Sequence, residues 1–219
     1  MNLHEQYRPR AWQDVIAQER AIDTINRLRV RGLGGRAFWL SGRSGTGKTT
    51  IGRLIAQEVA GSSMGVEEVD ATASLTAAKL ESIADRFDGR GLFGGHALLV
   101  NEAHGLRKDA VRFLLTWIER LPEHAVIVFT SSLPIEDKKQ TDLLSEIGHE
   151  TWPLLSRCTV IKMQERDTAD AYAAHLKRIA ERENLDGQPV ERYKKLVNDC
   201  RGNLRRCLQE IEAGKLMVN

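Results

Sequence analysis

The sequence predicts an α/β fold, with a five-stranded parallel sheet followed by a small domain of three helices. Short apolar segments alternate with helix-like segments up to about residue 163, a pattern typical of parallel sheets covered on both faces. A glycine-rich segment, GRSGTGKT at 42–49, lies directly between a strand-like and a helix-like segment. After residue 163 only helix-like segments remain.

Each predicted element has local support in the sequence. Strands are expected in short segments rich in apolar or β-branched residues, at 37–41, 66–70, 97–101, 125–130 and 159–163. Helices are expected where apolar residues recur at helical spacing, at 18–30, 48–60, 76–87, 106–120 and 142–149. We therefore divide the chain into an α/β core, 1–163, and a helical lid domain, 164–219. The three lid helices are expected within 166–185, 189–200 and 203–214. The polar segment 134–142 reads as a surface loop.

The glycine-rich segment fits the full P-loop pattern G-x-x-x-x-G-K-S/T, in the strand–loop–helix context that this motif requires. Glycines allow positive φ and close backbone approach, and the following helix N-terminus holds phosphate oxygens. Lys48 is expected to contact the β- and γ-phosphates, and Thr49 to offer its hydroxyl to Mg²⁺. A glycine-rich turn without function fits less well, because motif and context agree. The predicted nucleotide contacts in this segment are Gly42, Ser44, Gly45, Thr46, Gly47, Lys48, Thr49 and Thr50.

The segment ALLVNE at 97–102 predicts the second half of a site for ATP and Mg²⁺. Glu102 is the candidate general base, although a solvated loop glutamate is the alternative. Asn101 stands where such sites use an aspartate, and with Thr49 it is the predicted metal contact. Asn keeps one carbonyl oxygen but loses the charge, and we expect its NH₂ to face groups that need an acceptor. Mg²⁺ prefers carboxylates. The sequence therefore predicts normal ATP binding, slow hydrolysis and a raised Mg²⁺ requirement, with faster turnover in Asn101→Asp.

Polar residues near this pair carry weaker predictions. His104 is either an ordinary loop histidine or a link between the site and a partner. One of Thr130, Ser131 and Ser132, at the end of the next predicted strand, is expected to reach the γ-phosphate or the attacking water. The alternative is that these hydroxyls only end a strand and begin a turn.

Composition excludes several classes of protein. The chain has 219 residues and a net charge of +2, which permits a local nucleic-acid contact but does not argue for one. No apolar run reaches the roughly 18 residues of a transmembrane helix, and the N-terminus does not read as a signal segment. Its three cysteines do not form a disulfide framework or a zinc-knuckle pattern. We expect a cytoplasmic protein.

The motifs together resemble AAA+ clamp-loader subunits, such as replication factor C small subunits and the bacterial gamma/tau subunit. The resemblance rests on EQYRPRAWQDVIAQE at 5–19, the P-loop, DAVRFLLTWIERLPEHAVIVFTSS at 109–132, LLSRC at 154–158 and RGNLRRCLQEIE at 201–212. It implies an adenine pocket formed by Tyr7, Arg8 and Pro9, and a catalytic role for Lys48. It also implies Ser131 as a sensor-1 residue, Arg205 as sensor 2, and Arg157 as an arginine finger acting on a neighbouring subunit.

The chain departs from this family at several points. It has no counterpart of the helical collar that closes the family's ring, so autonomous ring assembly is not expected. No cysteines lie between the two halves of the site, unlike in gamma/tau subunits, and residues 133–155 form a longer connection than usual. In DATASLTAAKLE at 70–81, Ser74 and Thr76 are expected either to contact DNA phosphates or to cap a helix.

The resemblance implies a clamp-loader-like ATPase subunit. It would act on DNA, a sliding clamp or another DNA-bound protein, together with related AAA+ subunits and without a membrane. The alternatives are a nucleotide-dependent regulatory or assembly subunit that hydrolyses ATP poorly, and a helicase loader. The sequence does not distinguish replication from repair, mobile-element or defence roles.

Overall fold

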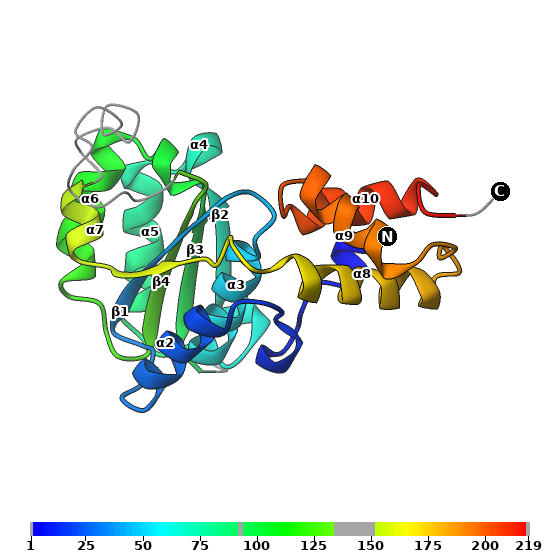
Figure 1. Ribbon diagram of the computed structural model, residues 1–219. Coiled ribbons are helices and arrows are strands. Elements are labelled where there is room, and N and C mark those ends of the chain that lie inside the picture. The colour runs from blue at the N-terminus through cyan, green and yellow to red at the C-terminus, as the bar shows by residue number, and fades with distance from the viewer. Residues whose placement is uncertain (1, 92–93, 134–151, 218–219) are drawn as a thin grey trace.

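The computed structural model describes residues 2–91, 94–133 and 152–217. Its centre is a five-stranded parallel sheet with the strand order β2-β3-β4-β1-β5 (Figure 1). All five predicted strands are present, and each differs from its predicted bounds by one residue or less at either end. They are β1 (Arg36–Ser41), β2 (Val66–Asp70), β3 (His96–Asn101), β4 (Ala125–Ser131) and β5 (Thr159–Lys162).

Helices cover both faces of the sheet. Because successive strand residues point to opposite faces, one strand contributes to the apolar clusters on both sides. Phe38 and Leu40 of β1 pack in the apolar cluster that includes α2 (Glu19–Arg29) and α3 (Lys48–Ala60). Trp39, between them, packs in the cluster that includes α5 (Ala77–Phe87) and α6 (Lys108–Ile118). The doubly wound fold expected from the sequence is therefore confirmed.

Several short elements were not predicted, because one helical turn carries no readable periodicity. These are α1 (Leu3–Gln6), η1 (Trp12–Asp14), η2 (Ser63–Gly65), α4 (Ala71–Ser74), η3 (Ala103–Gly105) and α7 (Trp152–Ser156). The helix expected at 142–149 and the loop expected at 134–142 lie outside the described residues. Thr76 caps α5, because its hydroxyl accepts from the Lys79 N–H at 3.3 Å, so the capping alternative holds for this residue.

Three helices form a second part of the molecule, which we call the lid: α8 (Ala169–Arg182), α9 (Val190–Asp199) and α10 (Leu204–Glu212). They share an apolar cluster of their own, separate from the two clusters on the sheet. Leu3 and Ala17, from the N-terminal segment, are buried in the same cluster, and the N-terminus lies beside the lid in Figure 1. None of the helices in the described ranges has the length and apolar composition needed to cross a membrane.

A buried glutamine links the N-terminal segment to the connection between sheet and lid. The side chain of Gln18, 1% exposed, accepts from the Gln164 N–H at 2.8 Å and donates to the Gln164 carbonyl at 3.1 Å. It also lies 3.3 Å from the hydroxyl of Tyr172 in α8. These bonds satisfy buried polar groups where the chain passes from the sheet to the lid.

Candidate active site

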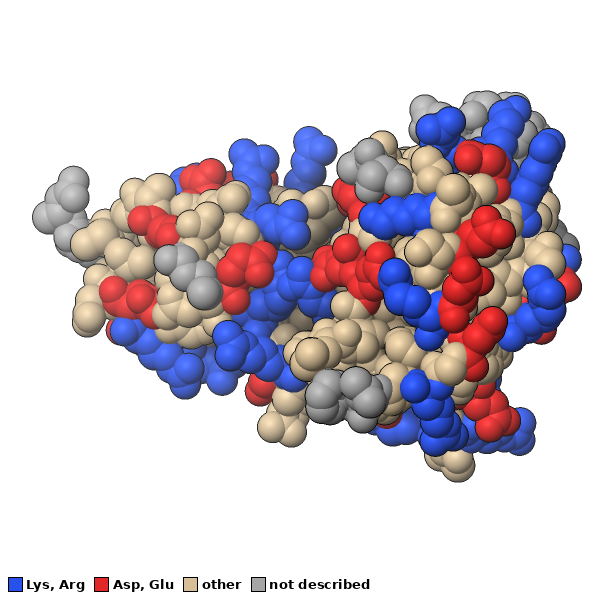
Figure 2. Space-filling model, turned by 180° about the vertical axis from the view of Figure 1, so that it is seen from behind, with Lys and Arg blue, Asp and Glu red and all other residues tan. Residues whose placement is uncertain are grey.

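A pocket lies where the P-loop, the N-terminal segment and the lid meet. Figure 2 shows Lys and Arg side chains gathered at this junction between the two parts of the molecule. The pocket is lined by most of the predicted site residues: Tyr7, Arg8, Pro9, Ser44, Gly45, Thr46, Gly47, Lys48, Thr49, Thr50, Glu102 and Arg205. Gly42, Asn101, Ser131 and Arg157 were also predicted, and they do not line it.

The P-loop has the backbone conformation that its glycines permit. Gly45 and Gly47 have φ of +80° and +95°, in the left-handed region, and Gly47 directly precedes α3. The ammonium group of Lys48 donates to the carbonyls of Gly42 and Arg43 at 2.7 and 2.8 Å. Burial lowers the pKa of Lys48, against the opposing charges of Glu102 and Glu165, and the nearby Arg205 lowers it further. Lys48 is thus a buried cation held inside an anion-binding loop.

The lid touches the P-loop directly. The N–H of Leu204, the first residue of α10, donates to the Gly45 carbonyl at 3.3 Å. Asn203 caps α10 by accepting from the Arg206 N–H at 3.1 Å. Arg205 follows Leu204 and faces the pocket, so the first turn of α10 brings one cation from the lid towards Lys48 of the core.

Asn101 lies at the centre of a hydrogen-bond network behind the pocket. Its carbonyl oxygen accepts from the hydroxyls of Thr49 at 3.1 Å and Thr130 at 3.0 Å. Its Nδ2 donates to Glu68 at 2.7 Å, and Glu68 is held by Arg53. The expectation that this NH₂ faces groups in need of an acceptor was wrong, because a carboxylate on β2 accepts from it.

Glu102 is held in a constrained position. It has φ of +50°, unusual for a residue other than glycine, and strain of this kind concentrates at functional sites. The Ser132 hydroxyl lies 3.2 and 3.1 Å from the two carboxylate oxygens of Glu102, and His104 Nδ1 lies 3.4 Å from one of them. Ser131 instead lies 3.5 Å from His104 and accepts from the Leu133 N–H. Thr130 and Ser132 therefore contact the Asn-Glu pair, and the role predicted for Ser131 stays a prediction.

Arg157 lies apart from the pocket of its own chain, just after α7. Its Nε donates to Glu119 at 2.7 Å, and its Nη1 donates to the Pro153 carbonyl at 3.1 Å. The Arg157 side chain is 37% exposed and the Glu119 side chain 57%, so solvent weakens this ion pair. Arg157 does not line the pocket of its own chain, and its role towards a neighbouring subunit stays a prediction.

Sequence reasoning missed eight further residues that line the pocket, from the N-terminal segment and the lid. They are His4, Val15, Ile16, Gln18, Tyr172, His175, Leu204 and Leu208. Burial lowers the pKa of His175 to about 4, and Arg178 and Arg182 add to the effect, so this imidazole is neutral at pH 7. The only sequence signal was the apolar run before Gln18 and the helical spacing of the lid residues. The apolar and aromatic side chains among these residues suit a nucleotide base.

The residues present fit a nucleotide that carries its own metal. Among the described residues, no three His, Cys, Asp or Glu side chains form a cluster that could hold a metal ion by themselves. Mg²⁺ commonly takes only one or two protein ligands and receives the rest from phosphates and water. The Thr49 hydroxyl and the Asn101 carbonyl oxygen, 3.1 Å apart, are oxygen groups suited to that role beside the P-loop.

The chain is similar to known proteins in both sequence and fold. The model of the ATPase family associated with various cellular activities (AAA) matches residues 38–150. The chain belongs to this ATPase family. The match begins in β1 and includes the P-loop and the Asn101–Glu102 pair. Membership of the family makes ATP the nucleotide to consider and ATP hydrolysis the reaction class.

Relatives of this AAA protein include clamp-loader subunits, so the resemblance inferred from the motifs is confirmed. The DNA polymerase III gamma subunit of Buchnera aphidicola is 23% identical over 232 aligned positions, covering 96% of this chain and 60% of that protein. The tau subunit of Bacillus subtilis is 25% identical over 158 positions, covering 60% of this chain and 27% of that protein. The chain therefore spans 60% and 27% of the length of these two relatives, less than two thirds in each case.

Solved structures confirm the fold of this AAA protein. Two variants of RuvB from Thermotoga maritima superpose with TM-scores of 0.70 and 0.71, at 18% and 17% sequence identity. Each superposition covers 94% of this chain, and 64% and 65% of the respective RuvB chains. At this identity the likeness concerns the fold alone.

Proposed function

We propose that this AAA protein is a clamp-loader-like ATPase subunit that binds ATP with Mg²⁺ between core and lid. It would act on DNA, a sliding clamp or another DNA-bound protein as part of an oligomer. The observation that carries this proposal is that Lys48, Glu102 and Arg205 line one pocket, with Arg205 coming from the lid. A cation from the lid, close to a buried lysine of the core, is suited to contact a terminal phosphate.

The same geometry supports the proposed division at residue 163 and the proposed residue roles. Lys48 would exchange its bonds to the Gly42 and Arg43 carbonyls for phosphate oxygens. Tyr7, Arg8 and Pro9 line the same pocket, where they would contact the base. Bound Mg²⁺ would neutralise phosphate charge during transfer. Glu102 would orient the attacking water once its carboxylate is released from Ser132.

We propose that hydrolysis is slow. Asn101 offers one neutral carbonyl oxygen where a carboxylate would offer a full negative charge, and this oxygen is shared by the hydroxyls of Thr49 and Thr130. Changes close to a metal site typically cost about 10–100-fold in metal affinity or activity. ATP binding depends mainly on the P-loop backbone and Lys48, which this substitution leaves intact.

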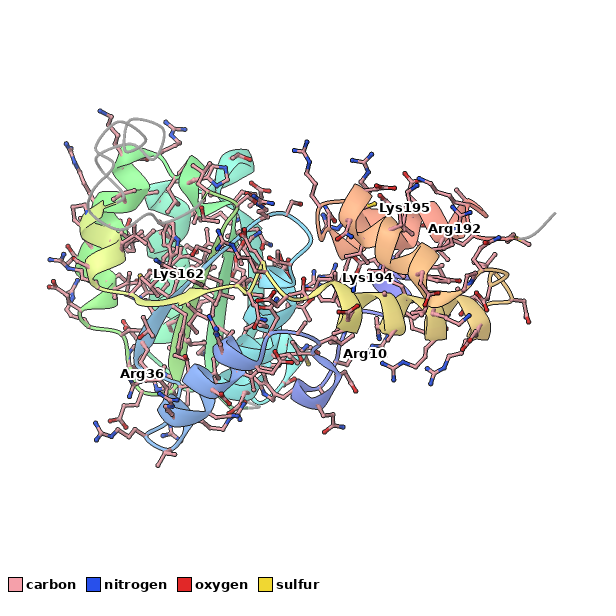
Figure 3. All side chains as sticks on the ribbon, viewed as in Figure 1. Arg10, Arg36, Lys162, Arg192, Lys194 and Lys195 are labelled. Carbon is pink, nitrogen blue, oxygen red and sulfur yellow. The ribbon has the colours of Figure 1, made fainter. Side chains whose placement is uncertain are left out.

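The proposed partners are neighbouring AAA subunits and DNA. Arg157, which lies outside the pocket of its own chain and pairs with the exposed Glu119, would complete the site of a neighbouring AAA subunit. Basic side chains lie on both parts of the molecule, with Arg36 and Lys162 on the core and Arg192 and Lys195 on α9 (Figure 3). They are dispersed over the surface, so DNA contact is supported by the relatives more than by one basic face. A cytoplasmic location is proposed on the same grounds.

A second candidate is a regulatory or assembly subunit that binds ATP and hydrolyses it poorly. It is favoured by the contacts of Glu102, whose two carboxylate oxygens lie 3.2 and 3.1 Å from the Ser132 hydroxyl, so a neighbouring side chain already engages this carboxylate. In this function the nucleotide would order the lid and create a surface for partners. The helicase-loader alternative has no contact in the described residues that favours it.

A measurement of phosphate release from ATP distinguishes the two candidate functions. The wild-type chain and a Lys48→Ala variant would be compared with and without primed DNA. We expect slow release that DNA stimulates and that Lys48→Ala abolishes. ATP binding and nucleotide-dependent association without turnover would favour the regulatory function. A chain that neither binds nor hydrolyses ATP would contradict both.

A further inference from the structure

A chain of polar contacts runs from the surface to the Thr49 hydroxyl. Arg53, on α3, donates to both oxygens of Glu68 on β2, at 2.7 and 3.1 Å. Glu68 in turn accepts from Asn101 Nδ2 at 2.7 Å, and Asn101 Oδ1 accepts from Thr49 and Thr130. Each of these contacts joins a hydrogen-bond donor to an acceptor.

The contact with Glu68 restricts which end of the Asn101 amide can point towards Thr49. An ionised carboxylate can only accept hydrogen bonds, so the group that faces Glu68 must be the NH₂ and not the carbonyl. The bidentate ion pair with Arg53 fixes the carboxylate in place. The threonine hydroxyls alone would not settle the orientation, because a hydroxyl can both donate and accept.

We propose that Glu68 is the positioning residue of the Mg²⁺–nucleotide site: it orients the Asn101 amide so that its carbonyl oxygen faces Thr49. The inference rests on the proposed function, because it assigns Glu68 a role in the same site. It also accounts for an amide at position 101. A carboxylate there would face the carboxylate of Glu68 at the 2.7 Å that now separates a donor from an acceptor.

The proposal changes the expected result of Asn101→Asp. Two carboxylates at that distance repel, so the new side chain would turn away from Glu68 and leave Thr49. The substitution alone therefore does not improve the site. Asn101→Asp combined with Glu68→Gln restores a donor opposite the carboxylate, because the glutamine NH₂ can take the place of the asparagine NH₂.

The first test is the Mg²⁺ dependence of nucleotide binding, measured by calorimetry with ATP for the wild type, the two single variants and the double variant. We expect Asn101→Asp alone to need at least as much Mg²⁺ as the wild type. The double variant is expected to need about tenfold less. Equal improvement in Asn101→Asp with and without Glu68→Gln would overturn the proposal. Glu67→Gln is the matched control. Glu67 lies next to Glu68 on β2, but its carboxylate pairs with Arg86 of α5 instead of Asn101.

The second test needs no nucleotide. The side-chain NH₂ of Asn101 would be followed by nitrogen–proton NMR and assigned by its loss in Asn101→Asp. In Glu68→Ala we expect this signal to shift and its exchange with water to speed up about tenfold or more, because its acceptor is gone. An unchanged signal would contradict the orienting role of Glu68. If the wild type failed to bind ATP at all, the proposed function would fall, and this signal would still report on the Glu68 contact.

Discussion

The side-chain oxygen of Asn203 occupies the place that a β-carbon on Gly45 would need. A Cβ built at Gly45 lies 2.0 Å from Asn203 Oδ1 and 2.9 Å from the Asn203 Cα, so the backbone of the lid blocks it as well as a side-chain tip. The contact is maintained by the Leu204 N–H, which donates to the Gly45 carbonyl. The P-loop can meet the lid this closely because position 45 carries no side chain.

Gly45→Ala should therefore separate the lid from the P-loop and lower ATP affinity by about tenfold or more, which corresponds to about 1.4 kcal/mol. Gly32→Ala is the matched control, since Gly32 has nearly the same φ, +83°, with no atom within 4 Å of an added Cβ. Both variants carry the backbone strain of a left-handed alanine, roughly 1–2 kcal/mol. Calorimetry showing equal ATP affinity in the two variants would mean that the lid contact does not support binding.

Arg205→Ala should weaken binding of ATP more than binding of ADP. Arg205 lines the pocket from the lid and lies near enough to Lys48 to lower its pKa, which suits a contact with the terminal phosphate. A charge-assisted hydrogen bond of roughly 1.5–3 kcal/mol is at stake, or about tenfold or more in affinity. Arg206→Ala is the control, because Arg206 is the next residue in α10 and does not line this pocket. Equal losses for both nucleotides would show that Arg205 does not distinguish them.

Arg157→Ala should leave the ATP affinity and stability of the isolated chain almost unchanged, because its ion pair with Glu119 is exposed and such pairs contribute about 0–1 kcal/mol. It should abolish turnover that depends on assembly, where arginine fingers contribute about 10³–10⁵ in rate. Glu119→Ala is the control: it breaks the same ion pair but keeps the Arg157 guanidinium, so assembly-dependent ATP turnover should persist in this variant. Mixtures of Arg157→Ala and Lys48→Ala chains that share interfaces should recover activity. No recovery in such mixtures would argue against a shared site.

His175 should make the nucleotide-free protein less stable in acid. Burial lowers its pKa to about 4 from an ordinary 6.5, so the unfolded chain binds the extra proton more readily than the folded one. The free energy of unfolding should therefore fall as the pH drops from 6.5 towards 4, by about 3 kcal/mol at most. His175→Gln, which cannot titrate, should flatten this slope in urea denaturation series. An identical slope in both proteins would show that His175 is not the responsible group.

The strands and the P-loop could be predicted because each is specified locally. Trp39 and its neighbours form a short apolar run, and the glycines and Lys48 follow at fixed spacing. Glu68 could not be singled out, because in VEEVD it reads as one of two solvated glutamates on a strand. Its importance depends on the parallel pairing of β2 with β3, which sets Asp70 opposite Asn101 and brings the Glu68 carboxylate to the asparagine amide.

The packing of the N-terminal segment against the lid could not be predicted for a similar reason. Leu3 lies in a helix of one turn, and nothing near it in sequence indicates that it packs with helices more than 160 residues later in the chain. Gln18 reads as a helix-start residue, yet it hydrogen-bonds the backbone of Gln164. Contacts of this kind are decided by tertiary packing, which the local patterns used for prediction do not report.

The central claim is that ATP binds with Mg²⁺ between the P-loop and the lid. Calorimetric titration of the purified chain with ATP, in the presence and absence of Mg²⁺ and for wild type beside Lys48→Ala, tests it most directly. The account predicts saturable binding of one ATP per chain by the wild type, and a loss of at least about tenfold in Lys48→Ala. Binding of equal strength in the two proteins, or no saturable binding by the wild type, would contradict it.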